Sequence, residues 1–159
     1  CTFVFMTYGI LLADLVNKEV MAVFICRVFL GLLFFFQGLD AVFNIRVNGV
    51  VDTIEGPLRE KGIPRFFIVG GAYYTSYVQL IAGFCLLIGF AKYYALYLLG
   101  FDLIIASIAF GMIKPMWDMQ HVFPRLLLLL LFLAAPSEWD VISVDYVWSI
   151  IKFFRSVTS

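Results

Sequence analysis

Three polar side chains lie within apolar stretches of the sequence, where an unpaired charge is costly. Arg27 and Asp102 are ionisable, and Gln79 carries an amide. If these stretches are membrane-crossing helices, Arg27 lies about 10 Å, Asp102 about 15 Å and Gln79 about 16 Å below one membrane face, at 1.5 Å per residue. A charge at such depth costs at least about 2.5 kcal/mol unless it is paired or hydrated. We therefore expect an Arg27–Asp102 ion pair, with Gln79 as a hydrogen-bonding neighbour.

This intramembrane cluster has a structural and a functional interpretation. Buried charge pairs often only determine which helices meet, and we favour that interpretation here. Intramembrane ionisable residues also mark ion and proton paths, so a small transporter or a proton path along the cluster is a further hypothesis. We rank it last, because three polar residues at one level form a plug more readily than a continuous path.

A second polar cluster is expected near the opposite membrane face. Asp40 lies about 6 Å and Arg125 about 9 Å inside that face at the same rise per residue. The adjoining loop ends add polar and aromatic residues, namely Arg65, Trp117, Asp118 and His121. Such a cluster would hold the polar head group of a quinone or a lipid, or would serve as a docking point for a partner protein.

The elements that position both clusters are long apolar stretches. Hydrophobic residues make up 64% of the 159 residues and charged residues 14%, whereas soluble domains have about 25% charged residues. A helix needs roughly 20 apolar residues to cross a bilayer. The sequence therefore predicts an integral, multi-pass membrane protein of the all-α class, a four-helix bundle with spans at 20–44, 66–90, 93–113 and 119–135.

Three regions follow from this assignment. Residues 1–19 form an apolar segment that is open to interpretation as an interfacial helix, a shortened span or a signal remnant, and the chain begins with Cys1 rather than Met. Residues 20–138 hold the four spans. Residues 139–159 alternate charged and apolar residues and predict an amphipathic segment at the membrane interface. Between the first two spans, residues 45–65 are expected to be a loop interrupted by Gly56-Pro57 and Gly62-Ile63-Pro64, with a short surface helix at 58–61.

Two of the predicted spans carry helix faces suited to close packing. The face of the first span is polar or small over much of its length, and small residues recur on the second; small residues let helix backbones approach closely. These faces consist of Arg27, Gly31, Phe34 and Gly38 on the first span and Ala72, Ser76, Gln79 and Gly83 on the second.

Composition and residue counts argue against several function classes. The formal net charge is zero, which argues against nucleic-acid binding. Three cysteines and one histidine are too few for a zinc site, a bis-histidine haem or an iron–sulfur cluster on this chain alone. We find no nucleotide-binding loop and no nucleophile–base pair, so no catalytic residue is assigned. Basic residues are distributed almost evenly between the two predicted membrane faces, so the orientation is left open.

The order of several short motifs resembles the DoxX family of four-helix membrane proteins. A basic residue is followed by Leu-Gly, an aromatic residue and a Gly in the first span, and a Gly-x-Pro precedes the second span. The motifs are Arg27, Leu30, Gly31, Phe34 and Gly38; GLDAVFN; Gly62-Ile63-Pro64; QLIAGFCLLIG; WDMQHVFPR; Trp139; and Asp145. The chain departs from the family pattern at Ala41, where lysine is common, and at Gln79, where the family has an acid.

This resemblance implies a membrane protein that works with redox partners. DoxX-like proteins include the small subunit of a thiosulfate:quinone oxidoreductase. Our leading hypothesis is a non-catalytic accessory subunit that anchors or packs into a larger membrane complex, with the bilayer and other membrane subunits as its partners. The alternative is a quinone-binding oxidoreductase subunit, for which quinone would be the only small-molecule cofactor.

Overall fold

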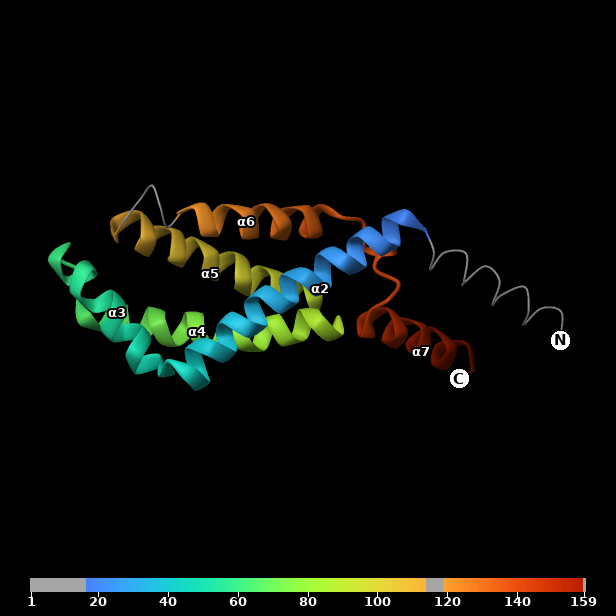
Figure 1. The fold of residues 1–159 in the computed structure, drawn as a ribbon. Coiled ribbons are helices and arrows are strands. Elements are labelled where there is room, and N and C mark those ends of the chain that lie inside the picture. The colour runs from blue at the N-terminus through green and yellow to red at the C-terminus, as the bar shows by residue number, and fades with distance from the viewer. Residues whose placement is uncertain (1–16, 114–118, 159) are drawn as a thin grey trace.

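A computed structural model describes residues 17–113 and 119–158, and over these residues the fold is all-helical (Figure 1). The helices are α2 (Lys18–Leu39), α3 (Arg46–Glu60), α4 (Arg65–Ile88), α5 (Lys92–Ile113), α6 (Met119–Ala134) and α7 (Val144–Thr158). A π-helical segment, η1 (Asp40–Asn44), joins α2 to α3, and a 3-10 turn, η2 (Ser137–Trp139), precedes α7.

Three of these helices are long and apolar enough to cross a membrane. They are Lys18–Asn44 with 27 residues, Arg65–Ile88 with 24 and Lys92–Ile113 with 22. Their ends lie within two residues of the predicted first three spans, which are confirmed as helices. The fourth predicted span is a helix too, but α6 has 16 residues and is shorter than the other three.

Large apolar side chains cover the outer surface of the long helices. Ile25, Phe36, Ile81 and Phe101 are all more than half exposed. Exposed apolar side chains in this number, on helices of spanning length, are what a lipid-facing surface requires. The structure therefore indicates an integral membrane protein.

Helices α2 and α4 approach each other closely at two glycines. A Cβ atom added at Gly83 would lie less than 3.0 Å from the backbone of Phe35, and one at Gly38 less than 3.0 Å from the backbone of Leu80. Only glycine permits this contact, because any side chain would push the two backbones apart. The two predicted packing faces are confirmed, since all eight of their residues are buried in α2 and α4.

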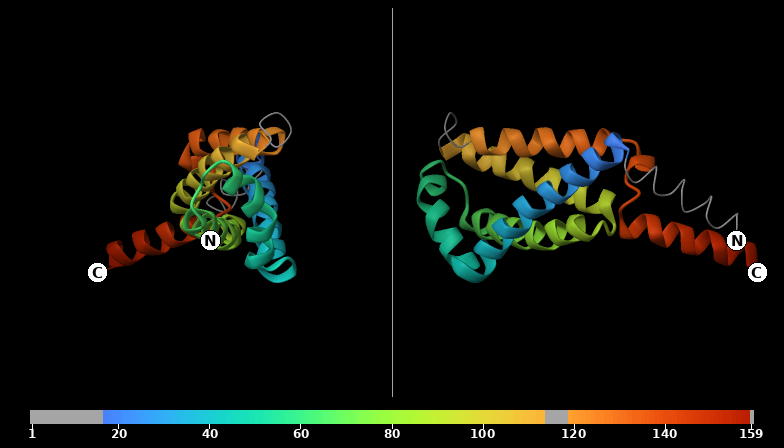
Figure 2. Two further views of the ribbon diagram at one scale, coloured as in Figure 1. Left: turned by 90° about the vertical axis from the view of Figure 1, so that its left-hand side faces the viewer. Right: turned by 45° about the vertical axis from the view of Figure 1, so that its right-hand side comes forward.

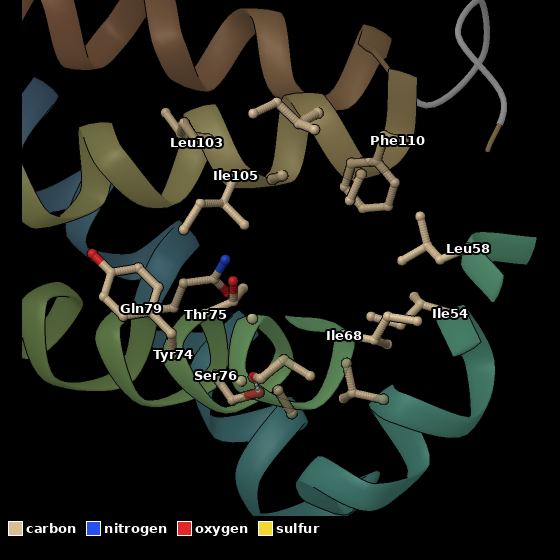
Figure 3. A pocket seen from close by; sticks show the side chains of 18 of the residues that line it. Ile54, Leu58, Ile68, Tyr74, Thr75, Ser76, Gln79, Leu103, Ile105 and Phe110 are labelled. Atoms are coloured by element: carbon tan, nitrogen blue, oxygen red, sulfur yellow. Dashed lines mark hydrogen bonds between the residues drawn. The ribbon is translucent and has the colours of Figure 1, made fainter. Parts of the chain in front are cut away.

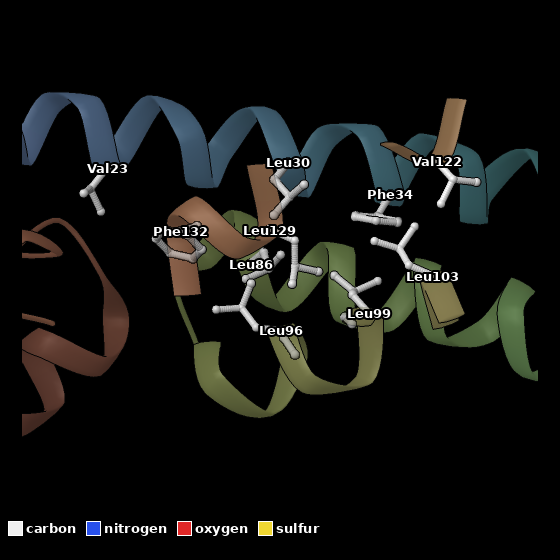
Figure 4. Packing of buried hydrophobic residues seen from close by; sticks show 12 residues of the cluster. Val23, Leu30, Phe34, Leu86, Leu96, Leu99, Leu103, Val122, Leu129 and Phe132 are labelled. Atoms are coloured by element: carbon white, nitrogen blue, oxygen red, sulfur yellow. The ribbon is translucent and has the colours of Figure 1, made fainter. Parts of the chain in front are cut away.

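The main hydrophobic core lies where α2, α4, α5 and α6 meet (Figure 4). Its largest fully buried apolar side chains are Leu30 and Phe34 from α2, Leu86 from α4, and Leu96 and Leu99 from α5. Leu129 and Phe132 bring α6 into the same core. Helix α6 is thus packed against the long helices rather than standing apart from them.

Helix α4 ends in a structure that its sequence favours. Gly89 has a φ of 69°, in the left-handed region that glycine adopts at little cost. The Gly89 N–H donates to the Leu86 carbonyl at 3.1 Å, and the Phe90 N–H donates to the Cys85 carbonyl at 2.9 Å. This pair of bonds is the Schellman motif that terminates helices. The turn into α5 is therefore short.

The prediction for residues 45–65 is wrong, because most of this segment is helix α3. Val47, Val51 and Leu58 recur at helical spacing and are buried against α4 and α5. Gly56 and Pro57 were interpreted as breaks, but burial of this apolar face outweighs their low helix propensity. The change of direction before α3 occurs at η1 and at Arg46, whose φ is 61°.

Helix α7 extends away from the other helices at the end of the protein where α2 begins (Figures 1 and 2). The predicted C-terminal segment, 139–159, is thus a helix over 144–158 preceded by η2. Residues 1–16 lie outside the described residues, so the prediction for 1–19 is largely outside them too.

We predict that Gly38→Ala and Gly83→Ala each destabilise the protein by about 1–3 kcal/mol, because the added methyl group overpacks the α2–α4 contact. Thermal unfolding in detergent, followed by circular dichroism, measures the change. Gly111→Ala in α5 is the matched control, since a Cβ there meets no atom within 4 Å. Equal stability of all three variants would contradict the close approach.

Candidate functional site

A cavity of about 610 Å³ lies between α3, α4 and α5 (Figure 3). We call it the membrane cavity. Helices α2 and α6 contribute residues to its wall as well. Its volume is within the range of roughly 300–1,000 Å³ that is typical of small-molecule sites.

The wall of the membrane cavity is mostly apolar. Helix α3 and the loop after it supply one side, and α4 and α5 supply the others. The apolar lining includes Ile54 and Leu58 from α3, Ile63 from the loop, Ile68 from α4, and Ile105 and Phe110 from α5. An apolar ligand body would therefore lie against α3 and the parts of α4 and α5 next to it.

Two glycines of α4 help to make the space. Gly70 and Gly71 both line the cavity, and a Cβ atom added at either would meet no atom within 4 Å. Unlike Gly83, they are not needed for contact between backbones. Their missing side chains instead leave volume that a larger residue would fill.

Two hydrogen-bonded pairs form the polar end of the cavity. Gln79 Nε2 donates to Asp102 Oδ2 at 2.8 Å, and Arg125 Nη1 donates to Gln37 Oε1 at 2.6 Å. Asp102 and Arg125 also attract each other electrostatically. We call these four residues the polar belt; Gln37, Gln79 and Arg125 line the cavity, and Asp102 lies behind Gln79.

The polar belt is deep in the membrane-embedded part of the protein. Gln79 lies about 21 Å from the start of α4 and about 14 Å from its end, at 1.5 Å per residue. Gln79 is 3% exposed and Asp102 is fully buried, and Asp102 Oδ1 has no hydrogen-bond partner. The Thr75 side chain lies near this carboxylate as well, and both neighbours of Asp102, Gln79 and Thr75, come from α4.

The predicted first cluster is only partly correct. Gln79 and Asp102 are neighbours as expected, but Arg27 pairs with Asp140 rather than with Asp102: Arg27 Nε lies 3.6 Å from Asp140 Oδ1. Arg27 packs at Gly89, about 15 Å along α4 from Gln79 at 1.5 Å per residue. Arg27, Gln79 and Asp102 therefore do not lie at one level of the membrane. The hypothesis of a proton or transport path along these three residues loses its geometric basis.

Arg27 belongs to a separate ionic group, which we call the charge clamp: Arg27, Lys92, Asp140 and Asp145. Lys92 Nζ donates to Asp140 Oδ2 at 3.0 Å, so two cations share one buried carboxylate. The guanidinium of Arg27 also donates to the carbonyl of Ile142. These contacts bind the segment before α7 to α2 and α5.

The fourth member of the charge clamp caps a helix. The Asp145 carboxylate accepts from the backbone N–H of Ala91 at 3.0 Å and of Lys92 at 3.1 Å. These are unpaired donors at the start of α5, where a negative charge is also favoured by the helix dipole. The Asp145 N–H in turn donates to the Gly89 carbonyl at 3.0 Å.

The predicted second cluster divides in the structure. Asp40 and Arg125 both line the membrane cavity. Arg65 does not; its Nε lies 3.3 Å from Glu55 Oε1 on α3. Trp117 and Asp118 lie outside the described residues. His121 is within α6, but its side chain also lies outside what the structure describes.

Sequence reasoning missed Gln37, Lys92 and Asp140. Gln37 follows three phenylalanines in an apolar stretch, which is the same signal that identified Gln79. Lys92 and Asp140 are ionisable residues near the membrane face below which Arg27 was placed, but so are Lys18, Glu19 and Glu138. The ion pairs of Asp140 with Arg27 and Lys92 were not predicted, because counting residues along a helix gives no position for a residue in a distant loop.

Within the described ranges, no group of three or more His, Cys, Asp or Glu side chains could hold a metal ion. Comparisons of the chain with protein-family models, with curated proteins and with solved structures give no match. Function is therefore argued from the geometry and chemistry of the site itself.

We predict that Asp140→Ala destabilises the protein by about 3–5 kcal/mol, because Arg27 and Lys92 are left as buried cations without their shared carboxylate. Arg59→Ala is the control: Arg59 forms an ion pair with Glu55, but its side chain is 62% exposed, so a loss of about 0–1 kcal/mol is expected. Thermal unfolding in detergent compares them. If the charge clamp had no structural role, Asp140→Ala and Arg59→Ala would lower the stability of the protein by the same amount.

Proposed function

We propose that this chain is an accessory subunit of a larger membrane complex and that it binds one amphipathic small molecule of the quinone class. The observation that carries the proposal is the membrane cavity, with an apolar wall and a deep polar belt. An elongated ligand would place its apolar body against α3 and its polar head at Gln79 and Arg125.

The position of the polar belt favours a quinone over a phospholipid. A phospholipid keeps its charged head group at the membrane surface, about 15 Å from the centre of a hydrocarbon core that is about 30 Å thick. The polar belt lies well inside the membrane-embedded part of α4 instead. A quinone head is uncharged and hydrogen-bonding, so it can enter at that depth.

The chemistry of the polar belt matches an uncharged head with carbonyl or hydroxyl groups. Arg125 and the amides of Gln37 and Gln79 provide N–H donors for carbonyl oxygens, and Asp102, behind Gln79, holds the Gln79 amide in place. The opposite charges of Arg125 and Asp102 balance each other. A charged head group would disturb this balance, whereas a neutral one would not.

The ligand would enter from the lipid phase. Phe67 on α4 and Ile108 on α5 both line the cavity, and they are 66% and 59% exposed. Exposed apolar residues on two membrane-spanning helices face the bilayer rather than water. A molecule dissolved in the bilayer could therefore reach the cavity sideways.

We also propose that α6 is a fourth span and that the chain is a DoxX-like four-helix membrane protein. The packing of α6 into the main core supports the first part. The motifs described above support the second, and the quinone-linked members of that family agree with the ligand class. In this proposal the cavity binds and positions the quinone, and a partner subunit supplies the electrons.

We predict that the protein in nanodiscs binds radiolabelled decylubiquinone above the level of empty nanodiscs. Gly71→Leu should weaken binding about tenfold or more by filling the cavity, and Gln79→Leu should do so by removing the amide; tenfold corresponds to about 1.4 kcal/mol. Equilibrium binding with a filtration assay measures the dissociation constants.

Gly111→Leu is the matched control for this experiment. It makes the same substitution in a long apolar helix, at a glycine that lies outside the cavity lining and has open space around it. Its affinity should equal that of the unmodified protein. The proposal fails if the protein adds nothing to the binding of empty nanodiscs, or if neither cavity variant weakens binding.

A further inference from the structure

Helix α7 presents large apolar side chains to its surroundings around most of its circumference. Trp148 is 59%, Phe153 66% and Phe154 63% exposed. Phe153 and Phe154 are consecutive, so they point in directions about 100° apart around the helix. A single protein groove covers only one side of a helix, whereas lipid acyl chains can cover both of these directions.

Four polar side chains of α7 form one stripe, and Arg155, three residues after Lys152, lies at its edge. Ser149, Lys152 and Ser156 follow Asp145 at spacings of three and four residues and therefore lie on the same face. A helix with a narrow polar stripe and a wide apolar face lies in the plane of the membrane interface, with the stripe toward water. Helix α7 has 15 residues and, unlike α6, none of its described residues joins either hydrophobic core, so it does not pack among the membrane-spanning helices.

The charge clamp determines where α7 begins. Asp145, in the first turn of α7, is bound to the start of α5 and to Gly89 at the end of α4. Both are ends of membrane-spanning helices, so the first turn of α7 is held at the membrane boundary. Figures 1 and 2 show that α7 continues from this point away from the other helices.

The charge of α7 indicates which lipids it meets. Its acid, Asp145, is used in capping α5, and its other charged residues are Lys152 and Arg155, both exposed. Lys18, at the same end of the protein, lies 3.8 Å from Glu19, so this pair adds no net charge and Lys152 and Arg155 are the cations that α7 itself supplies. Cations near the membrane surface are attracted to anionic head groups.

From these observations we infer that α7 is a membrane-surface helix that binds anionic lipid head groups through Lys152 and Arg155. Its aromatic side chains, including Trp148, lie among the upper parts of the acyl chains. The charge clamp holds this helix at the end of the protein where α2 begins, so anionic lipids gather at that end.

The test uses the full chain with Trp117→Phe and Trp139→Phe, which leave Trp148 as the only fluorescent tryptophan. The protein is placed in nanodiscs of phosphatidylcholine and phosphatidylglycerol at one fixed ratio. In one sample the phosphatidylglycerol carries bromine near the head-group end of its acyl chains, and in the other an equal amount of phosphatidylcholine does. Bromine quenches Trp148 only when it lies close by.

We expect the brominated phosphatidylglycerol to quench Trp148 about twofold more than the brominated phosphatidylcholine, because the two cations enrich anionic lipid around α7. Lys152→Gln with Arg155→Gln should remove this difference while quenching itself persists. Arg59→Gln with Lys61→Gln, at the far end of the protein, is the matched control and should keep the difference.

Two results would overturn the inference. If neither brominated lipid quenches Trp148, α7 lies in water or against protein rather than in the membrane interface. If both brominated lipids quench Trp148 equally in the protein that retains Lys152 and Arg155, α7 has no preference for anionic head groups. Neither result bears on quinone binding, because α7 contributes no residue to the lining of the membrane cavity.

Discussion

The close contact of α2 with α4 is the constraint on which the other elements depend. Gly38 and Gly83 let the two backbones touch, and no other residue would fit at either position. Because α2 is held against α4, α5 and α6 complete the main core on one side of this pair. Helix α3 then packs on the outer part of α4 and encloses the space that Gly70 and Gly71 leave open. In one half of α4, glycine permits close contact with α2. In the other half, glycine leaves space for the membrane cavity.

Buried charges are the second organising feature, and they form two groups with different environments. In the charge clamp, Arg27, Lys92 and Asp140 lie close together and connect distant parts of the chain, which is the arrangement of a structural site. In the polar belt, Gln37, Gln79 and Arg125 line a cavity, and Asp102 lies behind Gln79. Because a cavity with a few convergent polar groups is the usual form of a small-molecule site, the cavity next to the polar belt, rather than the buried charge alone, supports the proposal of a ligand.

The sequence predicted the features that depend on position along one helix. The first three spans and the buried faces with Gly38 and Gly83 follow from length and from 3.6-residue periodicity. The Gln79–Asp102 contact followed from equal depth in neighbouring helices. The partner of Arg27 did not, because Asp140 lies in a loop whose path no periodicity describes. Helix α3 was missed because Gly56-Pro57 resembled a break. The membrane cavity was anticipated only in part, through Asp40 and Arg125, because empty space between helices leaves no pattern in the residues.

The central claim is that the membrane cavity holds a small molecule in the protein as it occurs in the membrane. Native mass spectrometry of the chain, purified from its own membranes in a mild detergent, tests this most directly. The account predicts one uncharged apolar molecule retained per chain, with the ultraviolet spectrum of a quinone after extraction into organic solvent. Chains that carry no bound molecule, or only phospholipids in variable number, would contradict the account.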